Sequence, residues 1–176
     1  MANNDSTIVT NLEAEPNVVA NAFQLYGKQR ILTETFEIAA ADDDADTYTF
    51  FPVPLDARID DLQIVNDVIT AGTDYDFGFY KITDGNLGAV IDADILADGI
   101  DMDAAARAVW TSILFTGTGA ADQGSVGQRL WQYLGYSSIT AARAANQTNQ
   151  VYMVCTANTV GTAAGTLSAK LMITVE

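Results

Sequence analysis

The residues of this chain whose types and spacing could do chemistry are mainly aspartates in short runs. The densest runs lie at positions 42–46 and 92–103, and shorter ones at 60–61 and 74–76. Clustered carboxylates are hard oxygen ligands of the kind that Ca²⁺ prefers. The run from Asp92 departs from an EF-hand loop, because a third acid is missing at the required spacing and no Glu closes the loop. We therefore expect a solvated acidic surface, with Ca²⁺ binding as the alternative.

Two smaller features could support catalysis. Asp74 and Asp76 fall on the same face of a predicted strand, and glycoside hydrolysis needs two carboxyl groups a short distance apart in a cleft. No aromatic cleft accompanies them in the sequence. Cys155 lies within an apolar strand and has no His to activate it, because the chain contains none. We predict a buried core cysteine and no enzyme activity.

The remaining candidates favour packing over chemistry. Trp110 and Trp131 are interpreted as core or interface anchors before sugar-binding platforms. Gly117-Thr118-Gly119 lacks the Gly-Lys-Ser/Thr ending of a phosphate-binding loop. Zero His and one Cys exclude imidazole metal sites, thiolate zinc sites and an intrachain disulfide framework. No catalytic residue, cofactor site or metal site is therefore predicted.

The charge of the chain is large, negative and localised. Among 176 residues, 8 Lys and Arg stand against 23 Asp and Glu, a formal net charge of −15. Seventeen of the 23 acids lie between Glu37 and Asp103, and only two follow. Such a charge repels nucleic acid and anionic membranes, so neither is an expected partner. The first residues lack the basic and apolar regions of a signal peptide, and no window is apolar enough to span a membrane.

Residues 1–27 are predicted to be an arm and residues 28–176 a single domain. The arm mixes polar residues with more apolar ones than a solvated tail needs, so we expect it to lie on a neighbouring subunit; a floppy terminus is the alternative. Together with two bases that follow it, the arm supplies the candidate interface with a neighbouring subunit. Its residues are Ile8, Val9, Leu12, Val18, Val19, Phe23, Leu25, Lys28 and Arg30.

Short strands are predicted through most of the domain. They cover 28–38, 47–53, 58–66, 74–80, 87–91, 149–157 and 165–175. Tyr75, Phe77 and Phe79 alternate with polar residues and predict a core-facing strand. Pro52 and Pro54 indicate a strand end or a sheet edge, and the spacing of Ile59 and Leu62 predicts a bulge between them.

One or two short helices are predicted in the longest connection. Residues 104–109 are compatible with a helix, and 125–134 form an amphipathic one that Gly135 would end. Seven or eight strands at this spacing predict an all-β fold, an antiparallel β-sandwich of the jelly-roll type. An immunoglobulin-like sandwich remains the alternative.

Several phrases of the sequence, in order, resemble those of tailed-bacteriophage head decoration (cement) proteins over residues 25–175. They are ArgIleAspAspLeuGlnIleValAsnAsp at 58–67, ThrAlaGlyThrAspTyrAspPheGlyPheTyr at 70–80, LeuTrpGlnTyrLeuGly at 130–135 and ThrAlaAlaGlyThr at 162–166.

The resemblance implies a jelly-roll-like virion structural protein, usually a homotrimer, on the outer capsid surface. Made in the host cytoplasm, it would clamp neighbouring major capsid protein subunits, with a terminal arm extending across the shell and no catalytic residues. Lys28 and Arg30 would pair with capsid acids if they face the shell. The alternative is a surface-exposed virion binding module that recognises a host receptor or glycan, with Ca²⁺ as a possible requirement.

Overall fold

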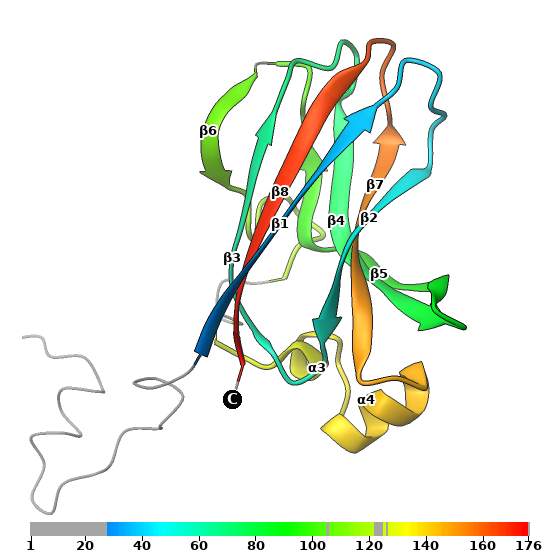
Figure 1. Ribbon diagram of the computed structural model, residues 1–176, viewed down its shortest axis with the longest axis vertical. Coiled ribbons are helices and arrows are strands. Elements are labelled where there is room, and N and C mark those ends of the chain that lie inside the picture. The colour runs from blue at the N-terminus through cyan, green and yellow to red at the C-terminus, as the bar shows by residue number, and fades with distance from the viewer. Residues whose placement is uncertain (1–27, 105, 122–124, 126, 176) are drawn as a thin grey trace, which may run out of the picture.

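The computed structural model is a sandwich of two four-stranded antiparallel sheets, described for residues 28–104, 106–121, 125 and 127–175. Figure 1 shows the two sheets, with the helices gathered at one end. The elements in chain order are β1 Lys28–Ile38, β2 Asp46–Pro54, β3 Arg58–Asn66, β4 Asp74–Thr83, β5 Asn86–Ile100, β6 Arg107–Ser112, α3 Leu130–Tyr133, α4 Ile139–Asn146, β7 Gln150–Thr159 and β8 Gly165–Val175.

The strand order identifies the sandwich as a jelly roll. One sheet has the order β1-β8-β3-β6 and the other β2-β7-β4-β5. The first strand therefore pairs with the last and the second with the seventh. Successive strands alternate between the sheets except for the β4–β5 hairpin, as in two interlocked Greek keys. An immunoglobulin-like sandwich has a different order, with strands A, B, E and D in one sheet and C, F and G in the other. The predicted fold class is confirmed, and the topology decides between its two versions.

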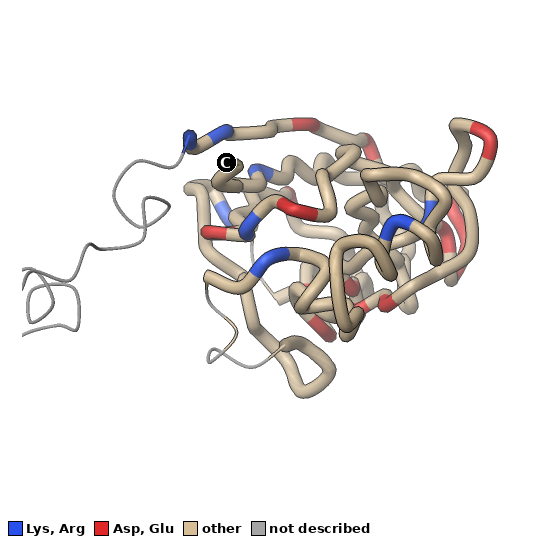
Figure 2. Tube along the Cα trace, turned by 90° about the horizontal axis from the view of Figure 1, so that it is seen from below, with Lys and Arg blue, Asp and Glu red and all other residues tan. Residues whose placement is uncertain are grey.

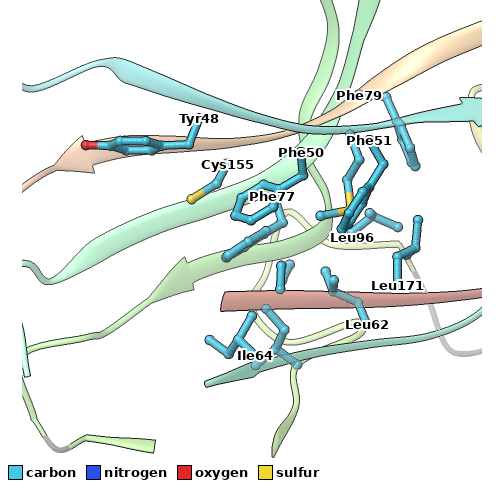
Figure 3. Packing of buried hydrophobic residues seen from close by; sticks show 14 of the residues in the cluster. Tyr48, Phe50, Phe51, Leu62, Ile64, Phe77, Phe79, Leu96, Cys155 and Leu171 are labelled. Carbon is cyan, nitrogen blue, oxygen red and sulfur yellow. The ribbon is translucent and has the colours of Figure 1, made fainter. Parts of the chain in front are cut away.

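The core lies between the two sheets. It is formed by apolar side chains that alternate with polar ones along the strands and point inward. Tyr75, Phe77 and Phe79 of β4 are completely buried, as their spacing predicts. Figure 3 shows side chains from both sheets converging there, including Phe50 and Phe77 from one sheet and Leu62, Ile64 and Leu171 from the other. Each fully buried large side chain stabilises the fold by roughly 1.5–3 kcal/mol.

The edge and bulge predictions are also confirmed. Pro52 and Pro54 lie in β2, which is an edge strand and so needs no amide donor from them on its free side. In β3 the pairing with β8 shifts between Ile59 and Asp61, at the predicted bulge. The bulge returns Leu62 to the core face, where it is completely buried.

The strand β5 is much longer than the predicted strand at 87–91, because a large bulge interrupts its pattern. Phe79 of β4 pairs with Asp92 and Phe77 pairs with Ala97, so two steps on β4 span five on β5. The extra backbone crosses Gly78 so closely that a Cβ there would lie 2.1 Å from the Asp92 carbonyl oxygen. Only glycine leaves room for this crossing.

Both helix predictions in the long connection need correction. The helix predicted over 104–109 is wrong, because Arg107–Ser112 forms β6 beside β3; Ala105 lies outside the described residues. Pairing with a sheet outweighs the weak helix preference of so short a segment. The second predicted helix, over 125–134, contracts to the four residues of α3. Gly127 has a φ of 80°, which an α-helix cannot contain.

Gly135 follows α3 with a φ of 74°, in the left-handed conformation expected of a residue that ends a helix. The helix α4 is absent from the sequence predictions. Ser138 caps it, accepting a hydrogen bond from the Ala141 amide at 3.1 Å.

Candidate interaction surface

The candidate interface residues that the structure describes lie together at the start of β1. Lys28 pairs with Val175 and Arg30 with Ile173 in the β1–β8 ladder, and both side chains are exposed. The seven apolar arm residues of the prediction lie outside the described residues. They are Ile8, Val9, Leu12, Val18, Val19, Phe23 and Leu25.

The other six bases are engaged within the domain. Lys81 donates to the Ala145 carbonyl at 3.0 Å, Arg107 to Asn66 at 2.9 Å and Arg143 to Asn149 at 2.6 Å. Arg58 donates to the Gly127 carbonyl, and Arg129 also interacts with its surroundings. Lys170 lies over the Trp110 ring, 4.5 Å from its centroid.

Lys28 and Arg30 differ from all of these. Among the described residues, neither makes a hydrogen bond, an ion pair or a ring contact. Two adjacent cationic side chains on one strand are thus free to meet a partner.

The charges of the domain separate toward its two ends. The connections β1–β2, β3–β4, β5–β6 and β7–β8 lie together at one end, which we call the acidic end (Figure 1). It carries six aspartates within these connections, at positions 42, 43, 44, 67, 101 and 103. The opposite end, the basic end, holds the start of β1, the start of β3, and both helices. It carries Lys28, Arg30, Arg58, Lys81, Arg129 and Arg143, with Asp56, Asp60 and Asp84 beside them.

Figure 2 views the molecule from the basic end and shows most of the Lys and Arg segments on the near side. Residues 1–27 join the domain at this end, through Lys28. The point at which the predicted arm joins the domain and the two bases without a partner among the described residues therefore lie at the same end.

The outer face of the sheet β1-β8-β3-β6 is rich in small hydroxyl groups. The Thr35 and Ser168 hydroxyls lie 2.8 Å apart, Thr166 donates to Glu37 at 3.0 Å, and Thr174 donates to Asp60 at 2.7 Å. Exposed apolar side chains lie on the two edge strands, Ile31 at 59% exposure on β1 and Val109 at 72% on β6.

The residues that the sequence offers as possible catalysts are buried or hydrogen-bonded within the domain. Cys155 is completely buried, and burial raises the pKa of its thiol well above the usual value. Asp76 is nearly buried and accepts hydrogen bonds from the Gly99 amide at 2.9 Å and from the Asn158 amide group at 2.6 Å. Asn158 also lies 3.3 Å from Asp74, so the two carboxylates of the predicted pair are bridged by a side chain.

In β5, an aspartate accepts hydrogen bonds from backbone amides of a distant loop. One oxygen of Asp98 accepts hydrogen bonds from the Thr118 amide at 2.9 Å and the Gly119 amide at 2.8 Å. These bonds lower the pKa of the Asp98 carboxyl. The sequence reasoning missed this role, although Gly117-Thr118-Gly119 marks a tight loop that needs an acceptor for its amides.

Asp92 is the most perturbed acid of this group. Burial, followed by its hydrogen bond to Asp94 and the charge of Asp94, raises the pKa of Asp92 to about 6. Within the described residues, no group of three or more His, Cys, Asp or Glu is arranged to hold a metal ion.

The two tryptophans occupy different environments. Trp131 packs against the core, and Trp110 is 40% exposed with Lys170 against its ring. The lysine covers part of the surface on which a sugar would stack. In the described part of the chain, no helix has the length and apolar character needed to cross a membrane.

Comparison with known proteins gives one structural likeness. No protein-family model matches the chain, and neither does any curated protein. Among solved structures, it is similar to a chain of the Cyanophage Pam1 capsid asymmetric unit. The two chains share 13% sequence identity over 100% of each, with a TM-score of 0.49. No functional residue is transferred from that chain.

Proposed function

We propose that this protein is a virion structural protein that decorates the outer surface of an icosahedral phage capsid. In this role it clamps neighbouring major capsid protein subunits, and no catalysis is needed. The resemblance of residues 25–175 to head decoration proteins supports the proposal. Its phrases fall on β3, β4, α3 and the β7–β8 turn, which belong to one folded domain.

The unpaired bases at the start of β1 are the observation that carries the proposal. Lys28 and Arg30 have no partner among the described residues, whereas the other six bases are engaged. Both lie where residues 1–27 join the domain. We propose that this end faces the shell and that the two bases pair with acidic groups of the capsid.

The acidic end then points away from the shell. A particle coated with many copies would present the aspartates of three of these connections to solvent. Like charges on neighbouring copies and particles repel, and this keeps such particles dispersed. The arm adds contact area with neighbouring subunits, and a homotrimer would multiply a weak single contact into a stable one.

The bases are tested by neutralising them. We expect Lys28→Gln combined with Arg30→Gln to weaken binding to empty capsid shells of the same virus by about tenfold. Each exposed ion pair contributes about 0.2–1 kcal/mol, and several equivalent contacts multiply the effect. Co-sedimentation over a range of chain concentrations measures the change.

A matched control separates local contacts from net charge. Gln29→Glu combined with Thr33→Glu also makes the chain more negative by two charges, on the opposite face of the same strand. We expect this variant to bind much more tightly than the neutralised one. Equal binding by both variants would show that Lys28 and Arg30 make no specific contact.

A further inference from the structure

The four edge strands of the sandwich differ in how their free edges are protected. In β2, Pro52 and Pro54 interrupt the row of amides and the register shifts once. The pairing of β5 shifts four times. The strand β6 is only six residues long, and it contains a bulge. Its four-residue step from Arg107 to Thr111 lies opposite a step of two residues on β3. Prolines, bulges and short length all discourage the addition of another strand.

The strand β1 has none of these features. Its eleven residues pair with β8 in one unbroken register, from Lys28 opposite Val175 to Ile38 opposite Gly165. It contains neither Pro nor Gly, and most of its side chains are exposed on both faces. A long, regular edge presents amides and carbonyls to a further strand and is a template for strand addition. The Thr35 amide donates to the Glu34 carboxylate at 3.1 Å, an exposed contact that a paired strand would replace.

The charges on β1 are arranged by sign along the strand. Lys28 and Arg30 lie near its start, and Glu34 and Glu37 lie toward its end. In Figure 2 the blue segments at the start of this strand are followed by red ones. Charges of a single sign would repel every second copy of the strand. A strand with separated signs is complementary to itself when the second copy runs in the opposite direction.

We propose that β1 pairs with β1 of a second copy of this chain, antiparallel and about a two-fold axis at Leu32. This register sets Arg30 opposite Glu34 of the partner subunit, and Glu34 opposite Arg30 of the partner subunit. On the other face, Ile31 lies opposite Thr33 of the partner subunit. The two four-stranded sheets become one continuous sheet of eight strands.

The sequence of β1 disfavours the other alignments. Moving the axis to Thr33 would place Arg30 opposite Phe36 of the partner subunit and lose both charge pairs. A parallel alignment in register would set Arg30 against the partner's Arg30 and Glu34 against the partner's Glu34, and like charges directly opposite destabilise a sheet. The half-buried Leu32 at the axis contributes an apolar contact with its own copy.

This contact needs no component of the shell. In a paired copy Arg30 meets Glu34 of the partner subunit, so Lys28 is the base that is left to pair with capsid acids. A two-fold contact uses the same surface on both copies and closes after two chains. It can therefore join protomers of two neighbouring trimers without using the three-fold contact.

A cysteine at the axis tests the geometry. Residues opposite each other in an antiparallel pair have Cα atoms about 4.5–5.5 Å apart, within the range that a disulfide spans. We expect purified Leu32→Cys to form covalent pairs under mild oxidation, seen on a non-reducing gel. The native Cys155 is buried and does not compete. Thr47→Cys, exposed on the edge strand β2, is the control. Cross-linking no greater than in this control would overturn the proposal.

Exchanging the charges of Arg30 and Glu34 tests whether these two residues pair across the proposed contact. We expect Arg30→Glu to weaken self-association by about tenfold or more in analytical ultracentrifugation, because it creates two like-charge contacts. Arg30→Glu combined with Glu34→Arg reverses both pairs and should restore association to within about threefold. A double variant that associates no better than the single variant would contradict the proposed register. Loss of capsid binding in either variant would not affect this outcome, since no capsid is present.

Discussion

At the scale of single residues, the acidic character of this chain has structural uses. Asp98 holds the Thr118 and Gly119 amides, Asp76 holds the Gly99 amide, and Asp42 accepts a hydrogen bond from the Tyr48 hydroxyl at 2.8 Å. The sequence allows a solvated acidic surface or a Ca²⁺ site to be predicted. It does not reveal which carboxylates fold back onto backbone amides, because those amides come from loops distant along the chain.

The carboxyl of Asp92 makes stability depend on pH. Its folded-state pKa of about 6 lies above the ordinary value of 3.8. The stabilisation from holding this proton is therefore full below about pH 4 and is lost as the pH rises through about 6. We expect Asp92→Asn to reduce the fall in melting temperature between pH 4.5 and pH 7, because the amide cannot ionise.

Asp84→Asn is the control for this pH experiment. It removes one charge from the exposed β4–β5 turn, where a φ of 51° is tolerated by both residues. We expect its pH dependence to follow that of the unmodified chain. An Asp92→Asn variant with the same pH dependence as Asp84→Asn would contradict a raised pKa at Asp92.

At the scale of elements, period-2 patterns made most strands predictable and longer-range pairing decided the rest. The strand β1 matches its predicted bounds, and the aromatic alternation in β4 located the core. The helix expected over 104–109 failed because β6 gains its partner from β3, some forty residues earlier. The long β5 was hidden because its bulge breaks the alternation after Asp92.

The crossing of β5 over β4 should depend on Gly78. A methyl group at this position would lie 2.1 Å from the Asp92 carbonyl oxygen and 2.3 Å from the Ala93 carbonyl carbon. We expect Gly78→Ala to destabilise the fold by about 3 kcal/mol or more, because backbone must move to admit the side chain. Urea unfolding measures the difference.

Gly85→Ala is the matched comparison. Its φ of 78° makes alanine unfavourable by about 1–2 kcal/mol, but nothing lies within 4 Å of the added Cβ. A loss at Gly78 no larger than the loss at Gly85 would contradict the close crossing of the two strands.

At the scale of the whole molecule, the jelly roll separates two surfaces with different charge. Four connections form the acidic end. Lys28 and Arg30, which have no partner among the described residues, lie at the opposite end, where residues 1–27 join the domain. The sequence allowed the acidic stretch between Glu37 and Asp103 to be located along the chain. The gathering of six of its aspartates at one end follows from the jelly-roll topology, which brings alternate connections together, and so could not be inferred without the strand order.

The central proposal is that the protein binds the outside of a capsid shell. The most direct measurement is co-sedimentation of the purified chain with empty shells of the same virus, at increasing ratios of chain to shell. We predict saturable binding at a fixed number of chains per shell, and shells that rupture at a higher temperature once bound. A folded chain that stays in the supernatant at every ratio would contradict the proposal.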